Sequence, residues 1–255
     1  MIAPMVQAFV DEIFSSVQGE GPWIGERHIF VRFMGCDLRC RYCDTPAALA
    51  LEERDKQGRP CRVQTSLRSF STEDVPNLLS PSDLTQFCSR LTIRGYSRAT
   101  LSLTGGEPLL HCDFLGSWLP EIGTTYRVYL ETNGIHHRAM QDLAAMIDVV
   151  SMDVKLPSST GLRPFWEEHR QFLASAAGRD IFVKAVVTGE TVKDDILQAA
   201  SLVSDLDAAI PLVLQPATGK WAPKPLVLLE LQEAALGIVS DVRVIPQAHK
   251  LLKLP

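Results

Sequence analysis

The sequence has no excess of positive charge and no long apolar run. Its 25 Lys and Arg residues are outnumbered by 30 Asp and Glu residues, which gives a formal net charge of −5. Binding to nucleic acids generally requires a basic face, so we expect no direct partner of that kind. One of the longest apolar stretches, residues 208–214, has about seven residues, whereas a membrane-spanning helix needs about 20. We therefore expect no association with a membrane.

Basic residues are also missing from the start of the chain, where Arg27 is the first Lys or Arg. A secretory signal begins with a basic segment, so this pattern predicts a cytoplasmic protein. In a reducing compartment the six cysteines are expected to be reactive or metal-bound rather than paired in disulfides.

Short runs of apolar and β-branched residues alternate with helical patterns along the chain. The expected strands are residues 28–33, 100–103, 127–131, 149–154, 181–187, 212–214 and 242–245. Most of these runs are continuously apolar, which is typical of strands buried on both faces of a parallel sheet. Helices are expected from Ser82 toward residue 91, over residues 137–147 and over residues 192–206. About six βα units predict an α/β fold, a partial (β/α)6 TIM-like barrel, with residues 1–255 in a single domain.

The segment 46–98 fits this alternation least and is treated as a variable segment. Residues 52–62 are rich in charge, which predicts a solvated loop. Cys61, Cys88 and Cys112 are isolated in the sequence, so we expect buried or free thiols rather than ligands of an auxiliary cluster.

Three cysteines follow the first expected strand with the spacing C-x3-C-x2-C. Cys36, Cys40 and Cys43 are close enough in sequence to converge on one metal centre, and thiolates are the ligands of iron–sulfur clusters. A structural zinc site usually has four ligands, often from two close cysteine pairs, and the sequence has no second C-x-x-C. The motif therefore favours a cluster in which one iron is open to a further ligand.

Polar residues lie at or just after the C-terminal ends of several of the later strands. These motifs are T-G-G-E-P at 104–108, E-T-N-G at 131–134, S-M-D-V-K at 151–155 and L-Q-P-A at 214–217. Barrel-type folds place their active sites at the C-terminal ends of the strands. Gly105 and Gly106 would let the backbone approach a ligand closely, and carbonyl groups with the Glu107 carboxylate would suit an ammonium group. Ser151, Asp153 and Lys155 are also compatible with a purely structural network.

Together these motifs resemble the radical S-adenosylmethionine (SAM) superfamily, whose three cysteines hold a [4Fe–4S] cluster. In that superfamily the amine and carboxylate of SAM bind the fourth iron. The resemblance implies that Cys36, Cys40 and Cys43 are the cluster ligands. It further implies SAM contacts at Tyr42, Gly105, Gly106, Glu107, Ser151, Lys155 and Gln215.

Segments outside the cysteine loop resemble one family within this superfamily, the 7-carboxy-7-deazaguanine synthases. The segments are E-I-F-S-S-V-Q-G-E-G-P at 12–22, F-V-R at 30–32, D-T at 44–45 and P-Q-A-H-K at 246–250, with Pro255. The resemblance runs from residue 11 to residue 255 and is weak over 46–98. It implies a carbon–nitrogen lyase of 7-deazapurine and queuosine biosynthesis. The implied reaction is a Mg²⁺-dependent, radical SAM ring contraction of 6-carboxy-5,6,7,8-tetrahydropterin to 7-carboxy-7-deazaguanine, with loss of ammonia.

The same resemblance implies site residues and partners. The implied substrate contacts are Val17, Gln18, Gly19, Glu20, Arg32, Thr104, His249 and Pro255, and the implied Mg²⁺ ligand is Thr45. No catalytic side chain is expected beyond the cofactors. An electron donor such as flavodoxin or ferredoxin and a homodimer are also implied. The residue types agree, because amide and carboxylate groups pair with the N–H donors of a pterin edge, and an arginine pairs with a carboxylate.

The last residues, 242–255, are expected to form a strand and a tail that contribute to the active site. Residues 251–254 are apolar enough to dock, which would bring the carboxylate of Pro255 near the substrate.

Two alternatives stay open. A glycyl-radical-enzyme activase, which acts on a protein partner, would have a similar cysteine loop. A non-catalytic iron–sulfur or zinc-binding module would explain the cysteines but would give residues 104–108 no role. Cleavage of SAM separates such a module from both enzymes.

Overall fold

One mixed sheet organises the chain in the computed structural model, which describes residues 6–95 and 98–255. Within these residues, ten strands pair in the order β10-β9-β8-β7-β6-β5-β2-β1-β3-β4. Every neighbouring pair between β10 and β2 in this order is parallel. They are β2 (Arg27–Phe33), β5 (Ala99–Gly105), β6 (Tyr126–Thr132), β7 (Val149–Val154), β8 (Asp180–Val187), β9 (Leu212–Pro216) and β10 (Val242–Val244). These strands include all seven that the sequence predicts.

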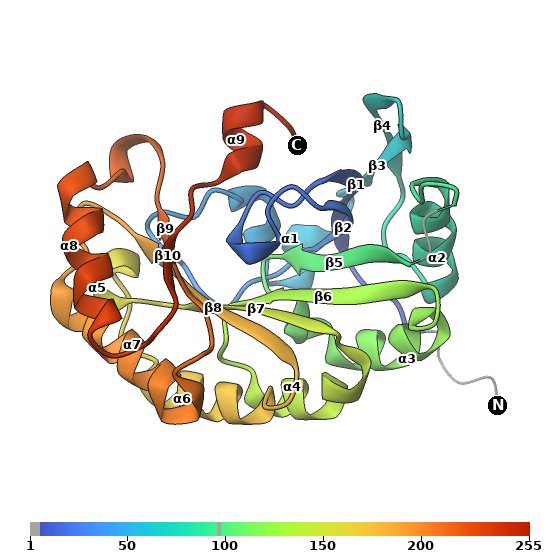
Figure 1. Cartoon of the computed structure of the whole chain (residues 1–255). Helices are drawn as coiled ribbons and strands as arrows, with labels where there is room; N and C mark the ends of the chain where they lie inside the picture. Colours follow the sequence, from blue (N-terminus) through green and yellow to red (C-terminus); the bar gives the residue numbers. More distant parts are fainter. Residues whose placement is uncertain (1–5, 96–97) are drawn as a thin grey trace.

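The longer helices cover one face of this sheet, as Figure 1 shows. They are α2 (Pro81–Arg90), α3 (Cys112–Ile122), α4 (His137–Leu143), α6 (Trp166–Ser175), α7 (Lys193–Asp207) and α8 (Pro225–Leu236). Short elements complete the chain: η1 (Gly21–Trp23), η2 (Pro46–Leu49), α1 (Glu53–Lys56), η3 (Pro108–His111), η4 (Ala144–Met146), α5 (Pro157–Thr160), η5 (Gly219–Trp221) and α9 (Ala248–Leu252). Helix α9 and the C-terminus lie on the opposite side of the sheet from α4 and α6. The fold is the predicted partial barrel, with helices outside and an open inner face.

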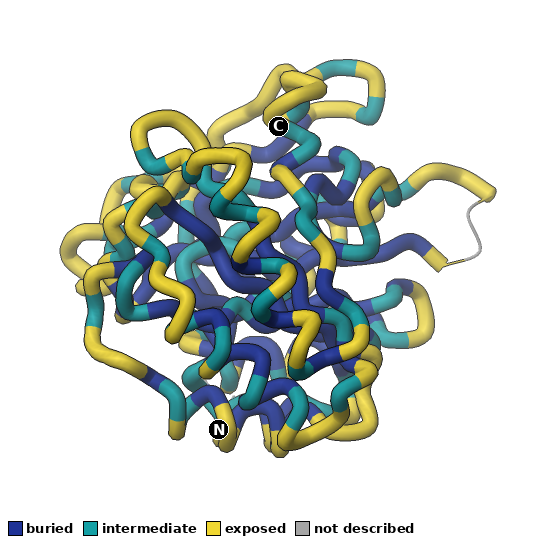
Figure 2. Tube along the Cα trace, turned by 60° about the vertical axis from the view of Figure 1, so that its left-hand side comes forward, coloured by how far each residue is buried: buried dark blue, intermediate teal, exposed yellow. Residues whose placement is uncertain are grey.

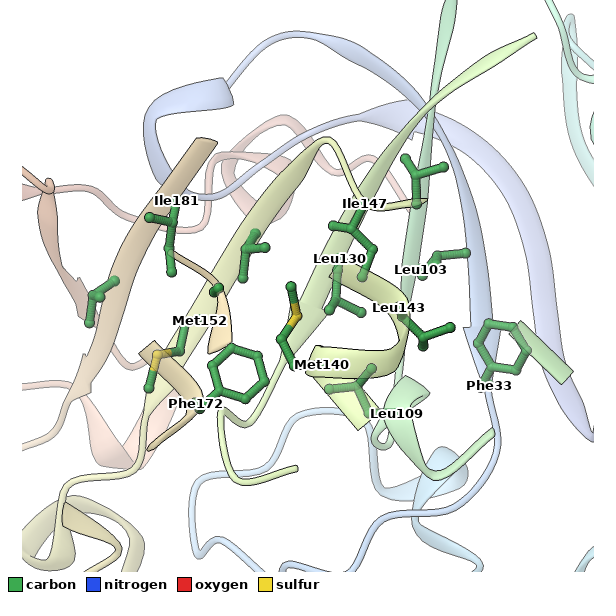
Figure 3. Packing of buried hydrophobic residues seen from close by; sticks show 14 of the residues in the cluster. Phe33, Leu103, Leu109, Leu130, Met140, Leu143, Ile147, Met152, Phe172 and Ile181 are labelled. Carbon is green, nitrogen blue, oxygen red and sulfur yellow. The ribbon is translucent and has the colours of Figure 1, made fainter. Parts of the chain in front are cut away.

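The two faces of the parallel strands differ because successive side chains point to opposite faces. Outward residues such as Leu103, Leu130 and Met152 are fully buried under the helices, where they pack with residues such as Met140 and Phe172 (Figure 3). Figure 2 shows the resulting contrast between buried strands and exposed outer loops. None of the helices in residues 6–95 and 98–255 is long and apolar enough to cross a membrane.

Inward side chains change from apolar to polar along each strand. Tyr129, Val149, Phe182 and Val213 form a separate apolar cluster on the inner face. Two positions later on the same strands come Glu131, Ser151, Lys184 and Gln215. The inner face therefore has an apolar floor, with polar groups gathered at the C-terminal ends of the strands.

Three strands at the other edge of the sheet are not predicted from the sequence. Strand β1 (Val10–Val17) is antiparallel to β2, and β3 (Cys61–Ser66) forms a hairpin with β4 (Ser69–Val75). The prediction of a solvated loop over residues 52–62 is wrong from Cys61 onward, since Cys61 is fully buried. Its charged neighbours Arg59 and Arg62 each lie 3.1 Å from a carboxylate oxygen of the buried Asp11. The charge in this segment holds the hairpin on β1 rather than facing water alone.

Helix α2 begins two residues earlier than predicted, because Ser80 rather than Ser82 is its N-cap. The Ser80 hydroxyl accepts a hydrogen bond from the Asp83 backbone N–H, and the Asp83 carboxylate accepts one from the Ser80 N–H. This reciprocal capping box satisfies two donors that the helix leaves free. Helices α3, α6 and α8 are not predicted from the sequence.

Candidate active site

A cavity lies at the C-terminal ends of the parallel strands and collects nearly all the predicted site residues. Its walls come from the end of β1, the cysteine loop after β2, the ends of β5 to β9 and the C-terminal segment. The predicted residues that line it are Val17, Gln18, Gly19, Glu20, Arg32, Cys36, Cys40, Tyr42, Cys43, Thr45, Thr104, Gly105, Gly106, Ser151, Lys155, Gln215, His249 and Pro255.

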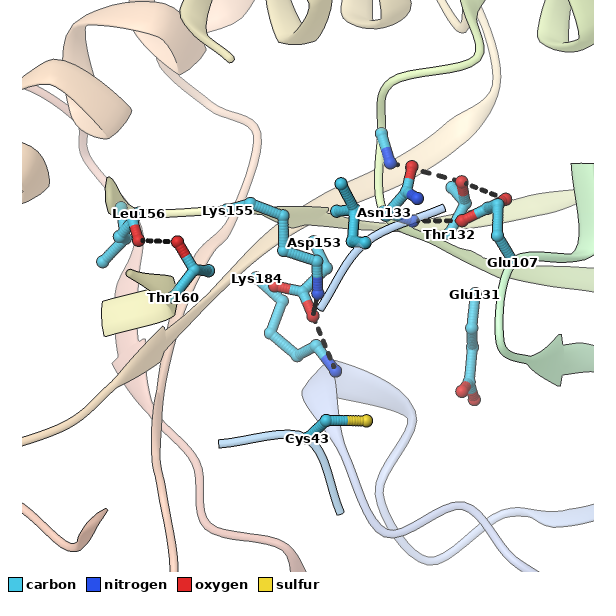
Figure 4. Close-up of polar contacts among 12 residues, drawn as sticks. Cys43, Glu107, Glu131, Thr132, Asn133, Asp153, Lys155, Leu156, Thr160 and Lys184 are labelled. Atoms are coloured by element: carbon cyan, nitrogen blue, oxygen red, sulfur yellow. Dashed lines mark hydrogen bonds and ion pairs between the residues drawn. The ribbon is translucent and has the colours of Figure 1, made fainter. Parts of the chain in front are cut away.

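Glu107 is the one predicted site residue outside the cavity lining. Its fully buried carboxylate accepts hydrogen bonds from the backbone N–H groups of Leu109 (3.0 Å) and Asn133 (2.7 Å) and from the Thr132 hydroxyl (2.9 Å). Figure 4 shows this contact at the end of β6. Glu107 therefore joins the turn after β5 to the turn after β6, and its role as an ammonium ligand of SAM stays a prediction.

Gly105 and Gly106 make room for protein backbone. A Cβ atom on Gly105, whose φ is +133°, would lie 2.2 Å from the carbonyl oxygen of Phe33, and one on Gly106 would lie 2.1 Å from that of Gly35. The Gly106 N–H donates to the Phe33 carbonyl (3.1 Å), and the Glu107 N–H donates to the Gly35 carbonyl (2.7 Å). The two glycines therefore fix the start of the cysteine loop against the turn after β5, while they also line the cavity.

The three cysteines of the motif are free thiols at the cavity wall. Burial raises the pKa of Cys36 to about 11 and also raises that of Cys40, so thiolates here require a positive centre beside them. No three His, Cys, Asp or Glu side chains of the described chain are grouped closely enough to hold a single ion. A four-iron cluster instead offers each thiolate its own iron, so it suits more widely spaced cysteines. The donor set fits a cluster better than a lone zinc ion.

An ion pair and several buried polar atoms line the cavity near the cysteines. Lys155 Nζ donates to Asp153 Oδ2 (2.7 Å) and lies 6.0 Å from the centre of the Tyr42 ring. Burial alone would lower the pKa of Lys155, but the Asp153 carboxylate raises it well above its usual value. Within the described residues, Tyr42 Oη, Asp153 Oδ1 and Gln215 Oε1 are buried without a hydrogen-bond partner. Because buried polar groups are normally satisfied, these atoms suit a polar ligand.

His169 on α6 supports this part of the cavity from behind. Its Nε2 accepts a hydrogen bond from the Lys155 backbone N–H (3.0 Å), so its Nδ1 carries the proton and donates to the Gly134 carbonyl (2.9 Å). Burial and the nearby Lys155 lower the pKa of His169 to about 4 despite the Gly134 carbonyl. A neutral imidazole therefore ties the ends of β6 and β7 together.

The opposite part of the cavity is built from side chains. Gln18 Nε2 donates to Glu131 Oε1 (2.9 Å), and the Thr104 hydroxyl donates to Glu131 Oε2 (2.7 Å). Arg32 Nε donates to Glu12 Oε1 (2.8 Å), which leaves the terminal nitrogens of the guanidinium for a ligand. This arrangement offers a carboxylate acceptor and a guanidinium donor to the same space.

Glu20 is paired in a way the sequence does not reveal. Its carboxylate contacts Lys184 Nζ and accepts a hydrogen bond from Gln247 Nε2 (2.8 Å). Sequence reasoning includes Glu131 only as part of the E-T-N-G motif, without a role of its own, and it misses Lys184 as a site residue. A lysine inside the otherwise apolar run of β8 and a glutamate at the end of β6 are signals that could have identified them, because buried charges need a partner or a function.

The C-terminal segment reaches the cavity through polar contacts. The Ala248 N–H donates to the Gly19 carbonyl (2.8 Å), and Lys250 Nζ donates to Asp44 Oδ2 (2.6 Å). The prediction that the apolar tail docks is wrong for Leu251 and Leu252, which are 73% and 61% exposed. This segment is therefore attached by main-chain and charged groups and not by these two leucines.

Comparisons with known proteins agree with this geometry. A family model described as the radical SAM superfamily matches residues 30–198. The chain is 40% identical to the 7-carboxy-7-deazaguanine synthase of Geobacter sulfurreducens, over 96% of this chain and 97% of that protein. It is 36% identical to the 7-carboxy-7-deazaguanine synthase of Methanopyrus kandleri, over 95% and 92% of the two chains.

A solved structure also matches this fold. The crystal structure of QueE from Escherichia coli covers 94% of each chain with a TM-score of 0.59 and 22% identity. The full-length sequence matches do not favour a glycyl-radical-enzyme activase. The chain belongs to the 7-carboxy-7-deazaguanine synthase family of the radical SAM superfamily, whose enzymes use a [4Fe–4S] cluster and SAM.

Proposed function

We propose that this enzyme contracts the ring of 6-carboxy-5,6,7,8-tetrahydropterin to 7-carboxy-7-deazaguanine, with loss of ammonia and in a Mg²⁺-dependent reaction. The observation that carries the proposal is that one cavity has the cysteine loop at one end and complementary acceptors and donors at the other. A substrate bound at the second end faces the cofactors bound at the first.

The second end matches the chemistry of a carboxylated pterin. Glu131 is held by two neutral donors, Gln18 and Thr104, so it stays an acceptor for the guanidine-like edge of the ring. Glu20 offers a second carboxylate, and the free nitrogens of Arg32 suit the substrate carboxylate. We also assign Val17, Gly19, His249 and Pro255, which line the same space, to the substrate.

We assign the first end to the cofactors. Cys36, Cys40 and Cys43 would hold the cluster, and the bound cofactors would supply the one-electron chemistry that starts the reaction. The protein would bind SAM through the buried polar atoms that have no partner within the described residues. The residues we assign to SAM are Tyr42, Gly105, Gly106, Ser151, Asp153, Lys155 and Gln215.

Thr45 is our proposed Mg²⁺ ligand, because this residue lines the cavity beside the cysteine loop. A hydroxyl oxygen is a hard donor of the kind that Mg²⁺ accepts. The adjacent Asp44 is already engaged by Lys250 and Gln247. Flavodoxin or ferredoxin as electron donor and a homodimer stay predictions.

The test is anaerobic incubation of the reconstituted protein with SAM, dithionite, Mg²⁺ and 6-carboxytetrahydropterin, with mass spectrometry of the products. We expect 7-carboxy-7-deazaguanine and 5′-deoxyadenosine. Glu131→Gln should lose most product while it still cleaves SAM, whereas Glu230→Gln, at an exposed position on α8, should behave like the wild type. SAM cleavage by the wild type without any ring-contracted product would contradict the proposed substrate.

A further inference from the structure

Lys184 is a buried cation for which the sequence motifs provide no role. It occupies an inward position of β8 between Phe182 and Val186, and only 8% of it is exposed. Removing an ammonium group from water costs several kcal/mol by general estimates, so such a lysine requires close anionic partners. Its side chain reaches the cavity wall, where the substrate end and the cofactor end meet.

The partners of Lys184 come from both ends of the cavity. Its Nζ contacts the Glu20 carboxylate in the loop after β1 and lies 3.8 Å from Asp153 Oδ2 on β7. Figure 4 shows Lys184 and Lys155 meeting at Asp153. Asp153 is thereby shared between the lysine nearest the cysteines and the lysine that binds Glu20. Glu20 has Lys184 as its cation and Gln247 as its side-chain amide donor.

We propose that Lys184 is a positioning residue that keeps Glu20 ionised and aimed into the cavity, so that Glu20 accepts hydrogen bonds from the N–H groups of the substrate. This inference rests on the proposed function, because it concerns how the same site recognises a donor-rich ring. An ionised carboxylate only accepts hydrogen bonds, whereas a carboxylic acid also presents a donor. A protonated Glu20 would set a donor against the donors of the substrate.

In these surroundings the ionisation of Glu20 depends on Lys184. Burial alone would raise the pKa of Glu20, but the Lys184 ammonium lowers it below its usual value. The neighbouring Asp44 works in the opposite direction. Removal of the lysine charge therefore leaves a buried carboxyl group beside another anion, and its pKa should rise toward neutrality.

Three titratable groups beside Glu20 and Lys184 keep the same charge between pH 7 and pH 9. Burial lowers the pKa of His249, so its ring stays neutral in this range. Asp44, with a pKa of about 2, stays ionised, and burial raises the pKa of Tyr129 well above 10. The remaining charged groups around this pair are Glu131, Asp153 and Lys250. A new titration in this range would therefore report Glu20.

The experiment compares Lys184→Met, Lys184→Arg and the double variant Lys184→Met/Glu20→Gln in the reconstituted enzyme. For Lys184→Met, the KM for 6-carboxytetrahydropterin should rise about tenfold or more at pH 7 and fall toward the wild-type value at pH 9. Lys184→Arg should stay close to the wild type. The double variant should lose the pH-dependent recovery, because it has no carboxyl group left to ionise.

Infrared titration provides a readout that needs no turnover. Lys184→Met should show one carboxyl group titrating at or above pH 6 that is absent from the wild type and from the double variant. An unchanged KM and titration, or a KM that is raised equally at every pH and not restored by arginine, would overturn the proposal. A wild type that makes no product contradicts the proposed function instead, and the infrared titration then decides the role of Lys184 by itself.

Discussion

The two ends of the cavity are built in different ways. At the cofactor end, the cysteine loop packs backbone to backbone against the turn after β5, with glycines where the chains meet. At the substrate end, charged and amide side chains join segments that are far apart, such as Gln247 and Glu20, 227 positions away from each other. The cofactor end therefore depends on the exact path of the backbone, and the substrate end depends on the balance of charges.

The largest effect should follow from removing the ligands of the cofactor end. Alanine at Cys36, Cys40 and Cys43 should reduce bound iron from about four atoms per chain to almost none, because a thiolate cluster has no other nearby ligands. Iron analysis and the visible absorption of anaerobically reconstituted protein measure this loss. Cys112→Ala is the matched control and should keep the cluster, since Cys112 lies at the start of α3 away from the cavity lining. A cluster that survives the triple substitution would refute the ligand assignment.

This difference between the ends also explains what the sequence predicts well. The cysteine spacing and the polar residues after β5, β7 and β9 can be recognised locally, because each lies within a few residues and next to a strand. Strand runs that are apolar on both faces are also visible in the sequence. The family resemblance predicts substrate residues such as Gln18, Glu20 and His249, and the structure brings them to the cavity.

What the sequence does not reveal depends on contacts over long distances. The pairing of Glu20 with Lys184 needs the register of β8 relative to the loop after β1. The inward or outward direction of Glu107 depends on the donors after β6 that surround it. The hairpin of β3 and β4 is not predicted, because the charged residues at its start are typical of a solvated loop. In the structure Arg59 and Arg62 instead bind the buried Asp11.

A smaller effect is expected from a single methyl group at the cofactor end. In Gly106→Ala the new Cβ would lie 2.1 Å from the Gly35 carbonyl oxygen and 2.7 Å from that of Ala48, so backbone must move. We expect a loss of about 2 kcal/mol or more in the free energy of unfolding, together with weaker SAM binding.

The matched control for this glycine lies in a helix. In Gly116→Ala on α3, the nearest atom is Leu143 Cδ2 at 3.8 Å, an ordinary contact. This change should stabilise the protein by roughly 0.5–1 kcal/mol, because alanine has a higher helix propensity than glycine. Urea unfolding of both variants measures the change in the free energy of unfolding, which should have opposite signs in the two. A neutral Gly106→Ala would show that the two backbones are not in the close contact described.

The same change at the substrate end should affect binding more than stability. In Gly19→Ala the new Cβ would meet the His249 side chain, with Nδ1 at 2.1 Å, rather than a strand backbone. We expect His249 and α9 to shift, the substrate KM to rise about tenfold, and the free energy of unfolding to fall by less than about 1 kcal/mol.

The double variant Gly19→Ala/His249→Ala removes the clash and therefore separates two effects. It should restore the position of α9, so that the remaining loss of binding reports the missing imidazole. The two variants are compared by their substrate KM and by their rate of SAM cleavage without substrate. The rate of SAM cleavage should stay near the wild-type value in both. Loss of the cluster in Gly19→Ala would mean that the two ends are not independent.

The last difference between the ends concerns acid, which should weaken the cofactor end at a higher pH than the substrate end. The Asp44 carboxyl has a pKa of about 2, because its bonds to Lys250 and Gln247 outweigh burial, and Lys184 also lowers the pKa of Glu20. Because the pKa of each group is lower in the folded protein than in the unfolded chain, their contribution to stability is retained between pH 6.5 and about pH 5 and is lost only at lower pH. His169 behind the cofactor end behaves differently, because its pKa falls from 6.5 to about 4 on folding.

The unfolded chain therefore binds a proton at His169 in a range where the folded protein does not. By linkage, this contribution to the free energy of unfolding is present above pH 6.5 and is lost as the pH falls toward 4, by roughly 1–3 kcal/mol. His169→Gln should remove this slope while it lowers stability at pH 7, because an amide does not titrate. Urea unfolding of both proteins from pH 7 to pH 4.5 measures the difference, in which the similar contribution of His28 cancels. Parallel pH dependences of the two proteins would show that His169 is not held neutral between Gly134 and Lys155.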